Sequence, residues 1–102
     1  MIPKKSIEEL INKHSTLERE LSSGNVDKKL FAEKSKEYSD LNEIVTNAKK
    51  YLNFEIEKSE LEKIFEDKKT DDELKKMVEL ELNELKTQNE KNEKKLKLFL
   101  LP

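Results

Sequence analysis

The sequence predicts an all-α fold, an antiparallel arrangement of three helices of which two are long and coiled-coil-like. The first observation is a run from Asp27 to about Asp67 that contains no glycine or proline and has apolar residues at intervals of three and four. That spacing places side chains on one face of a helix. The second is composition, because Ala, Glu, Lys, Leu and Arg make up 56 of the 102 residues, as is typical of long helices and coiled coils. The third is that Pro3, Gly24 and Pro102 are the only glycine and proline residues, and all three fall at expected helix boundaries.

Composition limits both the core and the classes of function. Hydrophobic residues make up 33% of the chain and charged residues 43%, so one domain with a small core is expected over residues 1–102. The chain has no cysteine, which excludes disulfides and thiolate metal sites. The two signs of charge are interleaved and the net charge is −2, so we expect no membrane contact and no direct, sequence-specific reading of nucleic acid. No apolar run approaches the roughly 20 residues that span a bilayer.

The first helix is predicted over residues 6–22. Ser6 and Glu9 have the spacing of a capping box, in which each side chain bonds the backbone N–H of the other residue. Gly24 suits the left-handed position just after a helix. The single histidine lies on the apolar face and has no cysteine or second histidine nearby, so we interpret it as a packed ring rather than a ligand or base. That face consists of Ile7, Leu10, Ile11, His14, Leu17 and Leu21.

The second helix is predicted over residues 27–66, with Asp27 as its N-cap. It would extend for about 60 Å at ~1.5 Å per residue, too long to bury its own apolar face, so the flanking segments must pack along it. The apolar stripe drifts after Leu52, so that the far end faces a different neighbour; a break near Asn53 is the alternative. The stripe consists of Phe31, Tyr38, Leu41, Val45, Ala48 and Leu52. The aromatic residues are predicted to belong mostly to the core: Phe31, Tyr38, Tyr51, Phe54, Phe65 and Phe99.

The third helix is predicted over residues 70–97, with a second capping box from Thr70 to Glu73. Steps of four and three form a heptad seam of Val78, Leu82, Leu85, Asn89, Asn92, Leu96 and Phe99. The two asparagines indicate that the seam reaches solvent there, and a role in fixing helix register is the alternative. Residues 98–102 are apolar and have no predicted turn, so we interpret them as a junction to a further domain.

No reaction chemistry is predicted from the residues. Carboxylate pairs at Glu8/Glu9, Asp71/Asp72 and Glu79/Glu81 could suggest acid–base chemistry, but 23 acidic residues produce such pairs by chance. The sequence contains no glycine-rich phosphate loop, nucleophile elbow or metal-ligand spacing. We therefore predict no catalytic, cofactor-binding or metal-binding residue, no cofactor and no enzymatic activity of this chain, and the sequence identifies no partner-binding residue.

Two segments resemble bacterial class I peptide chain release factors. Phe31–Leu41 is similar to a helix of that family with a serine–basic–Glu-Tyr core followed by Leu. Met77–Leu85, followed by Leu96–Pro102, is similar to the family's helix that ends in leucines and a proline before the next domain. The ending Leu100-Leu101-Pro102 favours the factor that reads UAA and UAG.

The resemblance implies that residues 1–102 are the N-terminal helical domain of a larger, cytoplasmic translation termination factor. The family's Gly-Gly-Gln motif for ester hydrolysis and its Pro-x-Thr codon-reading tripeptide do not occur here, so this domain alone neither reads codons nor releases peptides. The resemblance implies the ribosome as partner, at the base of the large-subunit stalk in the GTPase-associated centre, and also the GTPase that recycles release factors. A free-standing coiled-coil scaffold or adaptor is the alternative function.

Overall fold

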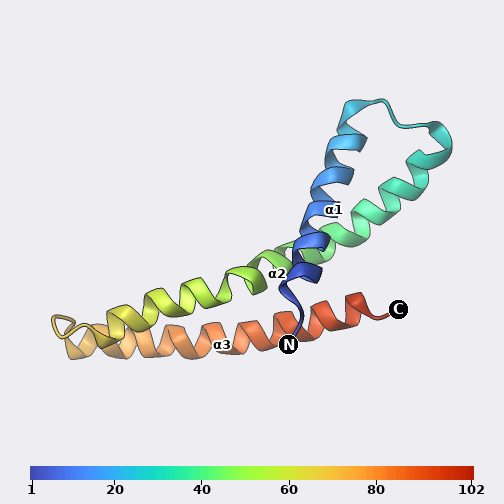
Figure 1. The fold of residues 1–102 in the computed structure, drawn as a ribbon. Coiled ribbons are helices and arrows are strands. Elements are labelled where there is room, and N and C mark those ends of the chain that lie inside the picture. Colours follow the sequence, from blue (N-terminus) through green and yellow to red (C-terminus); the bar gives the residue numbers. More distant parts are fainter.

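The computed structural model describes all of residues 1–102 and contains three helices and no strands. The helices are α1 (Lys4–Ser23), α2 (Lys28–Glu66) and α3 (Asp72–Leu100). Both α1 and α3 run antiparallel to α2, but they pack on different halves of it (Figure 1). The molecule consequently measures 61 × 28 × 19 Å. The all-α prediction is confirmed, as is the packing of both flanking segments along the central rod.

Helix α2 is continuous, so the alternative of a break near Asn53 is wrong. Its first residues are held by Asp27, whose carboxylate accepts a hydrogen bond from the Lys29 N–H at 3.1 Å, which confirms the predicted N-cap. The drift of the apolar stripe has the predicted consequence. The first half of α2 faces α1 and the second half faces α3 (Figure 1), so a single helix serves two hairpins.

Both predicted capping boxes are wrong, although Gly24 ends α1 as expected, with φ of 74°. Helix α1 begins two residues earlier than predicted, after Pro3, whose carbonyl accepts from the Ser6 N–H at 3.1 Å. Ser6 therefore already lies inside the first turn. Helix α3 begins after Asp71, whose carboxylate accepts from the Leu74 N–H at 2.8 Å. Thr70, the predicted cap, instead donates its hydroxyl to the Ile64 carbonyl of α2 at 2.8 Å.

Because Asp71 caps a helix and Ser6 does not, alanine substitutions at these two residues should have different effects on stability. We expect Asp71→Ala to lower the free energy of unfolding by about 1 kcal/mol, because the first turn of α3 loses its side-chain acceptor. Ser6→Ala should change it by less than about 0.5 kcal/mol, because the Ser6 hydroxyl makes no capping bond. Urea unfolding followed by far-UV circular dichroism measures both. A larger loss of stability from Ser6→Ala than from Asp71→Ala would indicate that Ser6 does form a capping box in α1.

Helix α3 ends at Leu100, three residues later than predicted. Residues 98–100 are thus the last turn of the helix, which corrects the prediction that the tail has no turn. No glycine or proline lies between Gly24 and Pro102, and the residue before a proline is disfavoured in the helical region. Leu101 accordingly takes an extended conformation, with φ −63° and ψ 137°.

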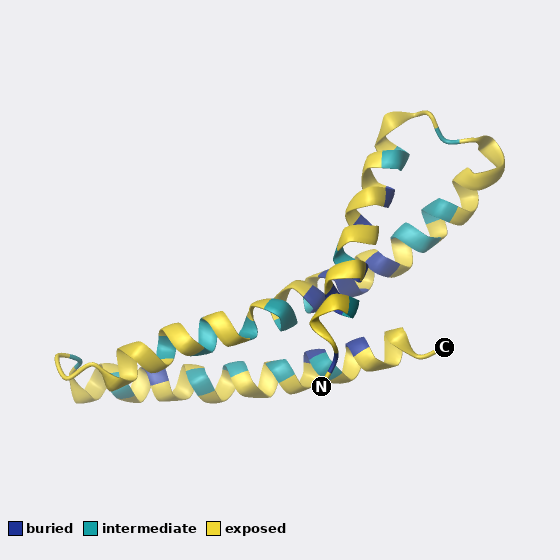
Figure 2. Cartoon of the chain, viewed as in Figure 1, coloured by how far each residue is buried: buried dark blue, intermediate teal, exposed yellow.

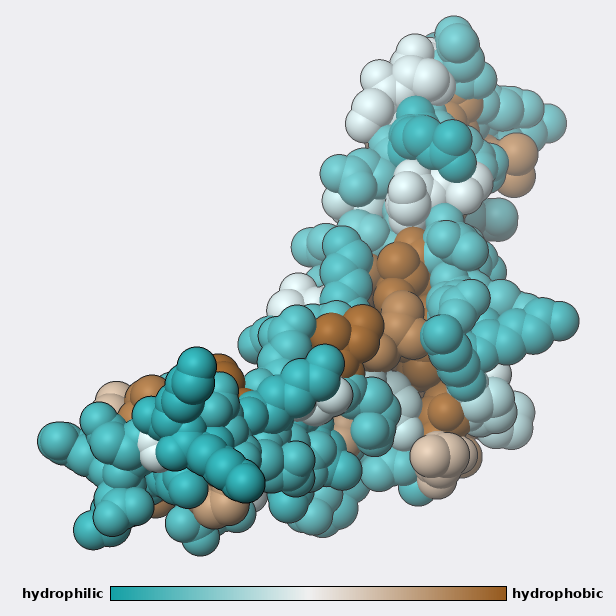
Figure 3. Space-filling view, turned by 60° about the vertical axis from the view of Figure 1, so that its left-hand side comes forward, coloured by the Kyte–Doolittle hydropathy of each residue, from teal (hydrophilic) through white to brown (hydrophobic).

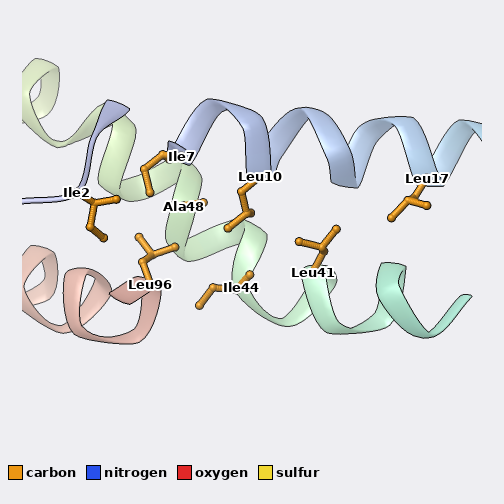
Figure 4. Close-up of a cluster of buried hydrophobic side chains, with 8 residues drawn as sticks. All are labelled: Ile2, Ile7, Leu10, Leu17, Leu41, Ile44, Ala48 and Leu96. Atoms are coloured by element: carbon orange, nitrogen blue, oxygen red, sulfur yellow. The ribbon is translucent and has the colours of Figure 1, made fainter. Parts of the chain in front are cut away.

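The core lies where the two hairpins meet. Only 12 of 102 residues are buried, and Figure 2 shows most of them near the middle of the molecule rather than at the hairpin ends. The largest buried cluster draws on all three helices and on the residues before α1 (Figure 4): Ile2, Ile7, Leu10, Leu17, Leu41, Ile44, Ala48 and Leu96. The predicted apolar face of the first helix is confirmed, because all six of its residues are buried or half-buried.

The prediction that the aromatic residues mostly form the core is wrong. Phe31 is 51% exposed, and Phe65 and Phe99 are each 38% exposed. Phe31 and Phe65 lie near opposite ends of α2, where at most two helices are in contact, and Phe99 lies in the last turn of α3 beside an open groove. Tyr38, Tyr51 and Phe54 are half-buried. A two-helix ribbon cannot enclose a large ring, so aromatic spacing alone overestimated burial.

Candidate interaction surfaces

The structure brings together no cluster of three or more histidine, cysteine or acidic side chains that could hold a metal ion. All six residues of the carboxylate pairs identified in the sequence are exposed to solvent. None of the three helices combines the length and hydrophobicity needed to cross a bilayer. The molecule's other candidate sites are the polar groups within the seams and the surfaces on which apolar side chains remain exposed.

His14 is a packed ring, as predicted. Only 8% of the residue is exposed. Its imidazole stacks on the Tyr38 ring with centroids 4.8 Å apart and planes 22° apart. Its Nε2 lies 3.0 Å from the Asn42 side-chain oxygen. Both partners belong to α2, so His14 helps to join α1 to the first half of α2.

One of the two asparagines of the α3 seam, Asn92, belongs to a buried polar layer between α2 and α3. Asn92 is only 2% exposed, and its side-chain oxygen accepts from Asn47 at 2.9 Å and from Gln88 at 3.1 Å. The preferred interpretation, that the seam reaches solvent at Asn92, is therefore wrong. The Asn47–Asn92 bond joins α2 to α3, as expected of a polar pair that fixes register. Asn89, one turn away, is half-buried, and its side-chain oxygen has no partner.

Asn92→Ala should lower the free energy of unfolding by about 1–3 kcal/mol, because Asn47 and Gln88 then lose a shared acceptor inside the seam. Asn83→Ala is the matched control, since Asn83 is exposed on the same helix, and it should change stability by less than about 0.5 kcal/mol. Chemical denaturation of the two variants tests this expectation. Equal stabilities would mean that the amide layer contributes nothing to the α2–α3 seam.

The residues before α1 tie the two hairpins together. Ile2 is buried, and its N–H donates to the Tyr51 hydroxyl at 3.3 Å. That hydroxyl donates to the Glu93 carboxylate at 3.4 Å, which also lies 3.2 Å from the Met1 amino group and 3.5 Å from the Lys97 ammonium. The pKa of Glu93 is lowered, mainly by the hydrogen bond from the amino terminus. Desolvation acts in the opposite direction and raises this pKa, whereas the charge of Lys97 lowers it further.

The largest concave surface is an open groove of about 900 Å³ between α1, the middle of α2 and the end of α3. Its apolar lining is Leu10, Leu41, Ile44, Leu98, Phe99 and Leu100. Leu98 is 71% exposed and Leu100 is 40% exposed. We call this surface, with its charged rim, the junction groove. The apolar end of the chain is recognisable in the sequence but the groove is not, because residues from three helices meet there only in the folded structure.

A second group of exposed apolar side chains lies at the far end of the α2–α3 hairpin. Ile64 and Phe65 of α2 are 41% and 38% exposed, and Leu74 and Met77 of α3 are 43% and 55% exposed. Figure 3 shows apolar side chains among hydrophilic ones at this end, and a broader apolar band near the middle of the same face. The rod therefore presents apolar surface outside the core both at this end and near its middle.

The module is a three-helix rod with a small central core and with apolar side chains exposed outside that core. Comparison with known families identifies the module: residues 10–102 match the PCRF domain. The chain belongs to the peptide chain release factor family, which confirms the resemblance found from residues 31–41 and 77–85.

Several relatives share one name. Peptide chain release factor 1 of Pelagibacter ubique is 67% identical over 102 residues, which are 100% of this chain and 29% of that protein. Release factor 1 of Brevibacillus brevis is 42% identical over 76 residues, or 74% of this chain and 21% of that protein. Release factor 1 of Bartonella quintana is 35% identical over 101 residues, which are 99% of this chain and 28% of that protein. The chain thus spans under a third of these relatives. No solved structure matches.

Proposed function

We propose that this chain is the N-terminal helical domain of a longer class I release factor of the UAA/UAG-reading type, acting in the cytoplasm. The observation that carries the proposal is 67% identity over the whole chain to a release factor 1 of which the chain spans only 29%. Because residues 1–102 contain neither a Gly-Gly-Gln nor a Pro-x-Thr motif, codon reading and ester hydrolysis are assigned to parts of the longer protein outside these residues.

In this proposal the domain contacts the ribosome at the base of the large-subunit stalk, with the GTPase that recycles release factors as a second partner. The shape supports a reaching role, because the rod is 61 Å long and its core lies near the middle. The exposed apolar side chains at the far end of the α2–α3 hairpin support a contact there, since clustered exposed apolar residues commonly mark interaction sites.

The coding sequence beyond residue 102 tests the assignment to a longer factor. We expect an open reading frame that continues and encodes both missing motifs. The full-length protein should release peptide from ribosomes paused at UAA and UAG but not at UGA. A stop codon directly after Pro102 would contradict the proposal. A free-standing scaffold would then remain, and light scattering should show a stable oligomer.

The stalk contact is tested by lysine-directed cross-linking of the full-length factor bound to ribosomes. Lysines are spread over all three helices, so each end of the rod can report its neighbours without substitution. We expect cross-links from residues 1–102 to proteins at the stalk base. Cross-links confined to other parts of the ribosome would contradict the stalk contact and leave the assignment to a release factor intact.

A further inference from the structure

We propose that the junction groove is the docking site for a later segment of the same polypeptide, and that this segment is apolar with basic flanks. The inference rests on the proposed function, because it requires the longer protein. The groove has walls from all three helices: Leu10 of α1, Leu41 and Ile44 of α2, and the last turn of α3. No segment within residues 1–102 fills it.

The residues at the bottom of the groove are buried and those of its α3 wall are exposed, as expected of a surface to which another segment binds. Leu10 and Leu41 are each only 5% exposed, and they belong to the central core. The adjoining wall from α3 is open, with Leu98 71% exposed. An apolar segment laid in the groove would extend the core outward and remove the exposed leucines from water, which is favourable in proportion to the apolar area covered.

The charges on the rim favour a basic partner. Four carboxylates line the groove, from Glu9, Glu37, Asp40 and Glu43, against two ammonium groups, from Lys13 and Lys95. Lys13 pairs with Glu37 across the α1–α2 hairpin. The other three carboxylates form no ion pair, so the rim keeps an excess of negative charge. Lysine or arginine at the flanks of the docked segment would complement that excess.

Position favours the same polypeptide over a second copy. Leu100 is the last helical residue of α3 and forms part of the groove wall, so a chain that continues past Pro102 begins beside the groove. A tethered segment on a short linker has an effective concentration in the millimolar range, far above that of a second copy in solution. The relative at 67% identity is more than three times as long as this chain, which leaves ample length for such a segment.

The test is site-specific photo-cross-linking in the full-length protein. A photoreactive amino acid replaces Asp40, an exposed residue on the groove rim, and Glu60 is the matched control, an exposed acidic residue of α2 outside the groove. We expect residue 40 to cross-link to a peptide downstream of residue 102 in the same molecule, and residue 60 not to do so. Cross-links to a second copy, or none from residue 40, would overturn the inference.

A second variant tests the apolar contact. Leu98→Asp places a charge on the open wall, and because Leu98 is largely exposed, the helices should fold unchanged by circular dichroism. We expect the cross-link yield from residue 40 to fall roughly tenfold, the change that about 1.4 kcal/mol produces. An unchanged yield would overturn the inference. A full-length protein that releases peptides at stop codons but lacks the residue-40 cross-link would refute only the docking, whereas an absent downstream coding sequence would refute both.

Discussion

Leu96→Ala is expected to lower the free energy of unfolding by about 2–5 kcal/mol. Leu96 is 0% exposed and lies in the cluster that joins all three helices (Figure 4). Shortening it removes buried apolar contacts and leaves a cavity between the end of α3 and the residues around Ala48. Because only 12 residues of the chain are buried, few other contacts can compensate, and a domain of this size has only about 5–15 kcal/mol in total.

Urea unfolding of the Leu96→Ala chain measures this loss, and Leu80→Ala is the control. Leu80 belongs to the same helix but is 69% exposed, so its truncation should change stability by less than about 0.5 kcal/mol. If the two variants lost equal stability, the core would not lie at the junction of the two hairpins.

Asn53→Pro is expected to lower the free energy of unfolding by about 3 kcal/mol or more, because proline within a helix removes a backbone hydrogen bond and clashes with the preceding turn. Asn53 lies inside α2, directly after Tyr51 and Leu52, which pack against the central core where the two hairpins meet. Breaking α2 there would uncouple the two hairpins. The loss should therefore appear both as lower helix content and as less cooperative unfolding.

The control for the proline is Asn53→Ala, which removes only an exposed hydrogen bond from the Asn53 side chain to Glu57 at 3.0 Å. It should leave stability within about 0.5 kcal/mol of the parent. Circular dichroism and denaturation of both variants provide the comparison. Proline tolerated as well as alanine would indicate that α2 already bends or breaks near this residue.

How well each feature could be predicted depended on how far apart in the sequence the interacting residues lie. Periodicity predicted the three helices, because the spacing of Leu41, Val45 and Ala48 depends only on helix geometry. The predicted cap Asp27 was confirmed, but the start of α1 moved from Ser6 to Pro3 and that of α3 from Thr70 to Asp71. Several nearby acceptors can compete for the same backbone N–H groups. Asp71, rather than its neighbour Thr70, took that role in α3, and a sequence pattern alone does not distinguish the two.

Burial and surfaces were less predictable, since they depend on which helices meet. Phe31 has core spacing but lies where only two helices are in contact, so it remains 51% exposed. Asn92 was expected near solvent but is buried, because Asn47 of α2 faces it and supplies a hydrogen bond. The matching asparagine on α2 was a signal in the sequence, although the register of α2 against α3 is needed to recognise it. The junction groove was unpredictable for the same reason.

The central claim is that one uninterrupted α2 carries both hairpins. Pulsed electron–electron double resonance tests it, with spin labels on cysteines introduced at Lys29 and Lys63. Both residues are exposed, and the chain has no native cysteine. The structure predicts a single narrow distribution near the ~50 Å that 34 residues of straight helix span at ~1.5 Å each. A broad distribution at much shorter distances would contradict the continuous rod, and with it the arrangement of both hairpins.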